Sequence, residues 1–386
     1  MPRLLLASNV FDEALARLIE QYRTGNRIVV SFSGGKDSTI VLELCIEAAR
    51  ITGRLPIDAV IRDEEIMLPG TYEYCERVHD RTAEVNLRWI YMNQPIINMF
   101  NRENPYWWVF DPALPPDKWV RKPPDFAEAW PDRVLYEMNS PARFPVPAGK
   151  RSVSVIGLRA QESRGRMMGL HSSGGYMSKP AGPNGVLKCR PIYDWLDGDV
   201  WRAIAVNKWD YNDAYDVMHR HGVRNKRLRI GPPTYNECSA ELIPHAMEAW
   251  PKWFDRVAER CPGIRSVANY GLKAVLPQRL AGETWEQTFQ RECIDTAPAW
   301  IAERAVAIRK ITLAAHARLS TTPLPERATN NMLPGEPGSW KALTEAYYRG
   351  DPFCAKSVHL PLMQPEYFRA GAGEWYEKPQ RKIKSK

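Results

Sequence analysis

The stretch Arg27-Ile-Val-Val-Ser-Phe-Ser-Gly-Gly-Lys-Asp-Ser-Thr-Ile40 decides the fold. Its first part, Ile28 to Phe32, is a short apolar and β-branched run, which is the pattern of a buried parallel strand. The hexapeptide Ser33-Gly-Gly-Lys-Asp-Ser38 follows at once, and the segment from Thr39 to Arg50 has the composition of a helix. A strand that passes through a glycine loop directly into a helix is an arrangement that binds phosphate groups.

This loop offers several kinds of group that bind an anion. Gly34 and Gly35 allow the backbone to approach a ligand closely, and the helix start adds N–H groups and the positive end of its dipole. Lys36 adds a point charge, and Ser33 and Ser38 add hydroxyl donors. The spacing is neither that of a Walker A loop nor that of the GxGxxG dinucleotide loop. For two adjacent glycines alone, an ordinary strand-to-helix turn would be an equal alternative.

Composition and cysteine spacing limit the class of protein. The chain has 386 residues, 44% of them apolar and 10% aromatic, as expected of a folded protein with one large or two ordinary domains. No apolar run approaches a membrane span and no secretory signal is evident, so we expect a cytoplasmic protein with no membrane partner. Seven widely spaced cysteines without a CxxC pair argue against a disulfide framework, a zinc ribbon or an iron–sulfur cluster. The net charge of +8 suits a nucleic acid, an anionic substrate or an ordinary basic protein.

Acidic residues follow a second predicted strand, Pro56 to Ile61. The C-terminal ends of strands in open α/β sheets face the ligand crevice, and carboxylates there hold Mg²⁺ or accept hydrogen bonds from a nucleotide. Asp63, Glu64 and Glu65 are therefore candidates, although three acids would equally suit the solvated start of a helix.

The remaining N-terminal half alternates strand and helix patterns. Apolar periodicity and turn residues predict helices at 11–22, 71–78 and 212–222 and strands at 87–92 and 151–156. This alternation predicts a doubly wound, mainly parallel α/β sheet.

Residues from about 93 to 150 differ in composition, because proline and tryptophan are frequent there. The prolines exclude a long helix and the tryptophans favour burial, so we expect an ordered insertion that serves as a lid or substrate loop. Basic residues interleave with the aromatic ones, so a nucleic-acid stacking surface is an alternative.

A second cationic motif, Gly157-Leu-Arg-Ala-Gln-Glu-Ser-Arg-Gly-Arg166, follows the strand predicted at 151–156. Arg159, Arg164 and Arg166 are suited to bidentate binding of phosphate or sulfate, and Glu162 could brace one of them. Taken alone, the motif would also suit a surface charge cluster. The segment from Arg224 to Arg229 is a further basic stretch, suited to a phosphate or a nucleic-acid backbone.

Two motifs resemble those of a known superfamily. SGGKDS at 33–38 resembles the PP-loop of the ATP pyrophosphatase and phosphoadenosine phosphosulfate (PAPS) reductase superfamily, and GLRAQESRGR resembles its second signature. The segment Pro191 to Trp201 resembles a further landmark of the PAPS-reductase-like branch, in which Trp195 would neighbour the site. The resemblance covers residues 25–235, about half of the chain, and implies an adenine nucleotide α-hydrolase-like, Rossmann-like fold. We accordingly expect a nucleotide-binding domain at 1–235, a helical subdomain at 236–320, and a linker, short helix and basic tail at 321–386.

The resemblance implies a nucleotide site at the matching positions. They are Ser31, Phe32, Ser33, Gly34, Gly35, Lys36, Asp37, Ser38, Asp63, Gly157, Arg159, Glu162, Ser163, Arg164, Arg166 and Arg229. The implied catalytic residues are Lys36, Asp37, Arg159 and Arg164. The implied reaction cleaves ATP between its α and β phosphates and adenylylates an acceptor, with Mg²⁺ near Asp37 or Asp63.

Three functional hypotheses remain open at this level. The first is the adenylylating enzyme, acting on sulfate, tRNA, DNA or a protein within a sulfur-transfer or nucleic-acid-modification and defence system, with a ParB-like or sulfur-carrier protein as partner. The second is a PAPS or adenosine phosphosulfate (APS) reductase that uses Cys354 or a thioredoxin partner, although the chain lacks the C-terminal Cys-Gly motif of assimilatory reductases. The third is a non-catalytic module that senses nucleotides or binds nucleic acid.

Overall fold

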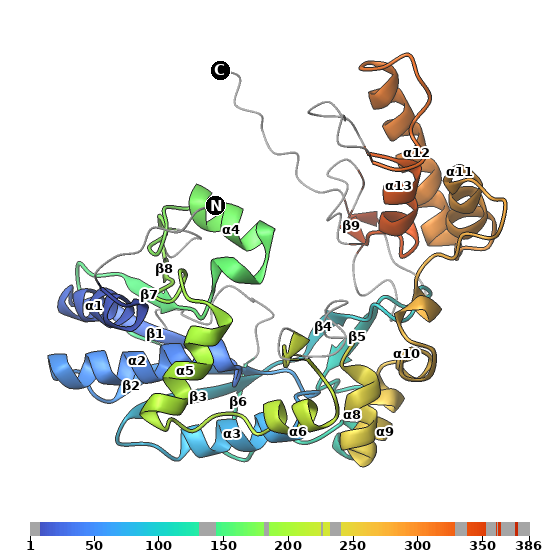
Figure 1. Ribbon diagram of the computed structural model, residues 1–386. Coiled ribbons are helices and arrows are strands. Elements are labelled where there is room, and N and C mark those ends of the chain that lie inside the picture. Colours follow the sequence, from blue (N-terminus) through green and yellow to red (C-terminus); the bar gives the residue numbers. More distant parts are fainter. Residues whose placement is uncertain are drawn as a thin grey trace. The chain divides into compact units, whose positions relative to one another are not determined.

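The computed structural model describes residues 8–130, 144–180, 185–224, 227–231, 241–328, 338–352, 360, 362–363 and 375–376. The chain divides into two compact units (Figure 1). The sheet unit comprises Met1–Gln94, Val109–Pro232 and Glu248–Trp253, and the helical unit comprises Pro95–Trp108, Pro233–Met247 and Phe254–Lys386.

The sheet unit is built on six strands in the order β6-β3-β2-β1-β7-β8. Their bounds are β1 Arg27–Phe32, β2 Ile57–Asp63, β3 Val85–Tyr91, β6 Glu128–Ala129, β7 Ser152–Val155 and β8 Leu187–Cys189. Every neighbouring pair in this sheet is parallel. The predicted fold class, a doubly wound and mainly parallel α/β sheet, is confirmed.

The strand order reverses at β1. The chain passes from β1 to β2 and β3 on one side, and later adds β7 and β8 on the other side of β1. Val30 pairs with Ala59 of β2 and with Val155 of β7, so the two neighbours of β1 run in register beside it. Such a reversal opens a crevice at the C-terminal ends of the two central strands, which is where ligands bind in this class of fold. The loops after β1 and β7 therefore meet at the switch point.

One face of this sheet is covered by helices that continue the main core. They are α1 Val10–Arg23, α2 Lys36–Thr52, α3 Pro69–His79 and α5 Asp197–Asn207. Leu18, Leu42, Tyr74 and Val200, one from each helix, belong to a single hydrophobic cluster with the strands. Two shorter helices, α4 Arg164–Ser172 and α6 Ala214–Arg220, and the 3₁₀ turns η1 Pro116–Lys118 and η2 Ala160–Glu162 complete the unit.

The other face of the sheet carries a smaller apolar cluster. Val29, Val60 and Ile90 project from β1, β2 and β3 and pack with Trp130 and Phe144. Both aromatic residues come from the segment predicted as an insertion, so part of that segment packs on the core as its tryptophan content indicated.

The helical unit has its own core. Its elements include α10 Ile264–Tyr270, η4 Leu272–Val275, α11 Trp285–Phe289, the π-helical turn η5 Gln290–Asp295, α12 Ala299–Ala317, α13 Trp340–Tyr347, β9 Leu362–Met363 and β10 Trp375–Tyr376. Trp285, Phe289, Ile308 and Trp340 form the centre of one cluster. Helices α8 Ile243–Ala249 and α9 Pro251–Arg260 and the hairpin strands β4 Gln94–Ile97 and β5 Tyr106–Val109 include residues of both units. Within the described residues, none of the helices has the length and apolar character that crossing a membrane requires.

Candidate anion-binding site

The glycine loop connects β1 to α2 at the switch point. Gly34 has φ +69°, a left-handed conformation, and a Cβ atom there would lie 2.8 Å from both the Cys75 sulfur and the Thr71 methyl group. Gly34 therefore meets both a conformational and a steric requirement. Gly35 is the N-cap of α2 and has no side chain that could bond to the first turn. A helix start without a side-chain cap presents backbone N–H groups to a ligand.

The two serines of the loop bond to one another. Their hydroxyl oxygens lie 3.1 Å apart, the Ser38 hydroxyl donates to the carbonyl of Gly35 at 2.8 Å, and it accepts the Ser33 N–H at 3.3 Å. Ser38 thus closes the loop, and because its hydroxyl hydrogen goes to Gly35, Ser33 is the donor in the pair of hydroxyls. Two predicted residues farther back have strand contacts instead: the Ser31 hydroxyl lies 3.0 Å from that of Ser154, and the Phe32 ring packs against Tyr74.

Two buried cations meet at the start of α2. The Lys36 side chain is 5% exposed and that of Arg159 is 4% exposed. Arg159 donates to both carboxylate oxygens of Asp37, at 2.6 and 3.4 Å, and to Asp197 at 3.3 Å. The Lys36 ammonium lies 3.6 Å from Asp37 and 3.4 Å from Asp197. Both cations are therefore held in place by the same two carboxylates.

Gly157 explains how the second motif reaches the first. A Cβ atom on Gly157 would lie 2.6 Å from the carbonyl carbon and oxygen of Asp37 and 2.8 Å from the backbone nitrogen of Ser38. Only a residue without a side chain allows this approach. The glycine of the second motif thus lets the backbone after β7 contact the first turn of α2, which brings Arg159 to Asp37.

The remainder of the second motif forms a cationic rim. The Arg166 guanidinium pairs with the Glu162 carboxylate, which also accepts the backbone N–H of Arg159 at 3.2 Å. The Arg229 guanidinium donates to the backbone carbonyl of Glu162 at 2.8 Å. Partial burial, together with repulsion from Arg229 and Arg159, lowers the pKa of Arg166. Neighbouring guanidinium groups that repel one another favour an anion between them.

The other predicted residues of this motif are placed differently. Ser163 caps α4, because its side chain accepts the N–H of Arg166 at 3.1 Å. Arg164 is the first residue of α4, and its side chain lies outside the described part of the structure.

Asp63 does not share the environment of Asp37. Its side chain is fully buried and accepts hydrogen bonds from Arg121 at 2.5 Å, from the Trp89 indole at 2.9 Å and from the N–H of Glu65 at 2.9 Å. Glu65 is also buried and accepts the N–H groups of Phe110 and Val120. The acids after β2 therefore hold the segment at 109–121 in place, and this geometry favours a structural role for Asp63 over binding of Mg²⁺ or nucleotide.

We expect Asp63→Asn to destabilise the protein by about 3 kcal/mol, because it leaves the half-buried guanidinium of Arg121 without its buried carboxylate. The midpoint of thermal unfolding measures this loss. Asp80→Asn is the control, because that side chain is 80% exposed, and we expect a change within about 0.5 kcal/mol for it. An unfolding midpoint of Asp63→Asn equal to that of the wild type would contradict the structural role.

Four residues around the loop were not predicted from the sequence. Asp197 bridges the two buried cations, and the Gln161 side chain accepts the Asp197 N–H at 2.8 Å. Asn212 donates to the Gly34 carbonyl and Tyr215 accepts the Lys36 N–H. Asn212 begins a predicted helix, and the sequence indicated only that it caps this helix. No local sequence pattern shows that its side chain contacts a residue almost 180 positions earlier.

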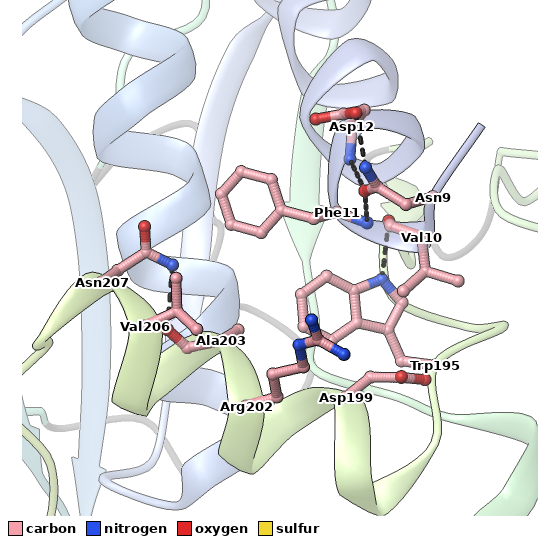
Figure 2. Close-up of a pocket in the computed structure, with 10 residues that line it drawn as sticks. All are labelled: Asn9, Val10, Phe11, Asp12, Trp195, Asp199, Arg202, Ala203, Val206 and Asn207. Atoms are coloured by element: carbon pink, nitrogen blue, oxygen red, sulfur yellow. Dashed lines mark hydrogen bonds between the residues drawn. The ribbon is translucent and has the colours of Figure 1, made fainter.

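A pocket of about 460 Å³ lies in the sheet unit apart from this loop. Figure 2 shows the rings of Phe11 and Trp195 on one side of it and residues of α5, such as Val206, on the other. The Trp195 indole N–H donates a hydrogen bond to the carbonyl of Val10 at 2.9 Å. Of the predicted site neighbours only Trp195 lines this pocket, so it is separate from the glycine loop.

The thiols and histidines show no site of their own in the described residues. Five cysteines are buried and form no disulfide, and burial raises the pKa of Cys189 and Cys293 to about 12. No group of three metal-ligating side chains occurs in the described ranges. Cys354 and the basic tail at 378–386 lie outside those ranges.

Fold and site together define a doubly wound α/β protein with a glycine loop and two buried cations at its switch point. No protein-family model matches the chain. Among curated proteins, the uncharacterized protein YbdN of Escherichia coli (strain K12) is 29% identical over 287 residues, which cover 70% of this chain and 68% of that protein.

Solved structures also match at low identity. FMN adenylyltransferase of Candida glabrata matches with 14% identity and a TM-score of 0.35, over 54% of this chain and 58% of that chain. PAPS reductase of Candida auris matches with 13% identity and a TM-score of 0.30, over 60% of this chain and 98% of that chain. Yeast FAD synthetase in complex with FAD matches with 14% identity and a TM-score of 0.31, over 55% of this chain and 65% of that chain.

Proposed function

We propose that the chain is an ATP-binding PP-loop enzyme that cleaves ATP between the α and β phosphates and adenylylates an acceptor. The observation that supports this most directly is the convergence of two buried cations, Lys36 and Arg159, on the start of α2, where Gly35 is the N-cap, at the switch point. Buried cations beside free backbone N–H groups are suited to a polyphosphate. The resemblance of SGGKDS to PP-loops supports ATP as the nucleotide.

Each group of the site has a role in this proposal. The loop amides and the α2 dipole would bind the β and γ phosphates. Lys36 and Arg159 would stabilise the negative charge that develops on pyrophosphate as it leaves. Because Asp37 and Asp197 already hold both cations in place, little reorganisation is required when the nucleotide binds. Arg166 and Arg229 would contact the α phosphate or an anionic acceptor.

Mg²⁺ would neutralise the phosphates, and the two candidate ligands differ in fit. Asp37 lies on the first turn of α2 with its side chain 16% exposed, and Mg²⁺ in nucleotide sites uses one or two carboxylates together with phosphate oxygens. Asp63 does not fit, because its carboxylate is enclosed and already accepts three hydrogen bonds. Asp37 is the more accessible of the two, and it would give up part of its pairing with Arg159 and Lys36 to bind the metal.

The experiment that tests this function follows α-labelled ATP with the full-length protein and Mg²⁺. We expect labelled AMP or an adenylylated product together with pyrophosphate, and no ADP, because the loop would bind the leaving pyrophosphate. Adding tRNA, DNA, sulfate or a candidate protein in turn identifies the acceptor by stimulation. A sulfate effect would support a sulfur-transfer role, and a tRNA or DNA effect would support nucleic-acid modification.

Two companion measurements, sulfite production and ATP binding, separate the alternatives. Production of sulfite from PAPS or APS with a thiol reductant, and no pyrophosphate from ATP, would establish the reductase and overturn the adenylylating proposal. Tight ATP binding without turnover under every condition would establish a nucleotide-sensing module instead.

A further inference from the structure

The segment that leads into α6 contacts the glycine loop from behind. The Asn212 side chain is fully buried, and its amide nitrogen donates to the carbonyl of Gly34 at 2.9 Å and to the hydroxyl of Thr71 at 2.8 Å. The Asn212 side-chain oxygen accepts the N–H of Ala214 at 2.9 Å. This one amide therefore joins the loop, the first turn of α3 and the start of α6.

Tyr215 contacts the other end of the loop. Its hydroxyl accepts the N–H of Lys36, the first helical residue of α2, at 2.8 Å. The tyrosine ring lies 5.8 Å from the Lys36 ammonium and packs edge-on against Trp201 of α5 at 5.2 Å. Burial raises the pKa of Tyr215, so the hydroxyl stays protonated at neutral pH.

Close packing limits movement of these residues. A Cβ atom on Gly70 would lie 2.7 Å from the backbone nitrogen of Ala214, so α3 and α6 touch at their first turns. Arg77 of α3 pairs with Asp210 at 2.8 Å and with Asp213 at 3.4 Å, on either side of Asn212. Asn212 and Tyr215 are thus presented to the loop by backbone that is itself held in place.

From these contacts we infer that Asn212 and Tyr215 are positioning residues of the anion site, in addition to the residues of the two cationic motifs. Asn212 fixes the carbonyl of Gly34 away from the ligand side, and Tyr215 fixes the amide of Lys36. The amides of Gly35 and Asp37 have no partner in the described residues and are left to bind phosphate. This inference depends on the proposed function only for the identity of the anion.

Binding of inorganic pyrophosphate to the full-length protein tests the inference without requiring turnover. Tyr215→Phe keeps the ring and removes only the hydroxyl. We expect it to weaken pyrophosphate binding about three- to tenfold, as measured by titration calorimetry, which is the range for one hydrogen bond. Asn212→Asp keeps the size and the acceptor oxygen but removes both donors, and we expect a loss of about tenfold or more.

Tyr211→Phe is the matched control. Tyr211 lies in the same segment and its hydroxyl donates to Asp216 at 2.8 Å, on the exposed side of α6. We expect unchanged pyrophosphate binding for this variant.

Hydrogen exchange of the Lys36 amide in the ligand-free protein distinguishes a local effect at the loop from a general loss of stability, when it is compared with exchange elsewhere in the sheet. Tyr215→Phe should accelerate exchange at Lys36 and leave the amides of β2 and β3 unchanged, while Tyr211→Phe should leave Lys36 unchanged. If the wild type binds pyrophosphate and Tyr215→Phe binds it equally well with unchanged exchange, the positioning role is overturned and the proposed function stands. If the wild type binds no pyrophosphate, the proposed function fails, and accelerated exchange at Lys36 would still support the positioning role.

Discussion

Lys36→Met is expected to lower the rate of pyrophosphate release from ATP about 100- to 1000-fold, the range for loss of one preorganised electrostatic group. Methionine keeps most of the volume of the lysine side chain, which is 5% exposed, and removes only the charge. Arg159 stays paired with Asp37 and Asp197, so the two carboxylates retain a cationic partner. The loss should therefore appear in the chemical step more than in stability.

The measurement is single-turnover release of labelled pyrophosphate at saturating ATP, together with the unfolding midpoint. Lys188→Met is the control, because Lys188 is an exposed lysine on β8 of the same sheet. Equal rates for Lys36→Met and the wild type would mean that Lys36 does not act on the leaving pyrophosphate. An equal fall for both lysine variants would point to a general effect of charge.

Gly157→Ala is expected to weaken nucleotide binding and turnover about 100-fold, because a displacement of roughly 1 Å at a catalytic group has an effect of this size. The added methyl group would overlap the backbone of Asp37 and Ser38, at 2.6 to 2.8 Å. The atoms in contact are backbone atoms, which cannot rotate away as a side chain would. The first turn of α2 and the segment at Gly157 to Arg159 must therefore move apart. We also expect a loss of stability of about 1–3 kcal/mol from overpacking.

Gly165→Ala, in the same motif, separates this effect from a general intolerance of alanine. The Cβ atom of Gly165 would meet nothing closer than the Ser163 hydroxyl at 4.0 Å. Gly165 lies in α4, where alanine is favoured over glycine. We expect near wild-type binding and equal or higher stability. Similar losses in the two alanine variants would show that the close approach at Gly157 is not what the site requires.

Local patterns were sufficient for the elements of the central sheet. Ile28 to Phe32 is predicted as a buried strand and forms β1, because a strand covered on both faces needs a continuous apolar run. Helix α2 begins at Lys36, three residues before the predicted start at Thr39, because Gly35 serves as the cap. The loop was predictable because each property that it uses belongs to its own residues: glycine conformation, lysine charge and helix polarity.

Residue type alone was insufficient where a side chain had several available partners. Asp63 ends β2 and Asp37 lies in the first turn of α2 after β1, and the resemblance implied Mg²⁺ near one or the other. Burial among Arg121, Trp89 and Glu65 separates Asp63 from Asp37, and all three partners depend on how the residues at 65–121 pack. An acidic residue at the end of a strand is therefore compatible with either metal binding or a structural role, and its burial in the folded protein decides between them.

By itself the sequence determined the fold class and located the glycine loop and the second cationic motif, because strand and helix periodicity and glycine-rich turns are local properties of the chain. Only the tertiary structure decided that Gly157 touches the start of α2, that Asp197 bridges the buried cations, and that Asn212 and Tyr215 hold the loop. These contacts join residues 38 to 179 positions apart. Such contacts arise from the parallel sheet and the packing of its helices, which no local pattern of residues records.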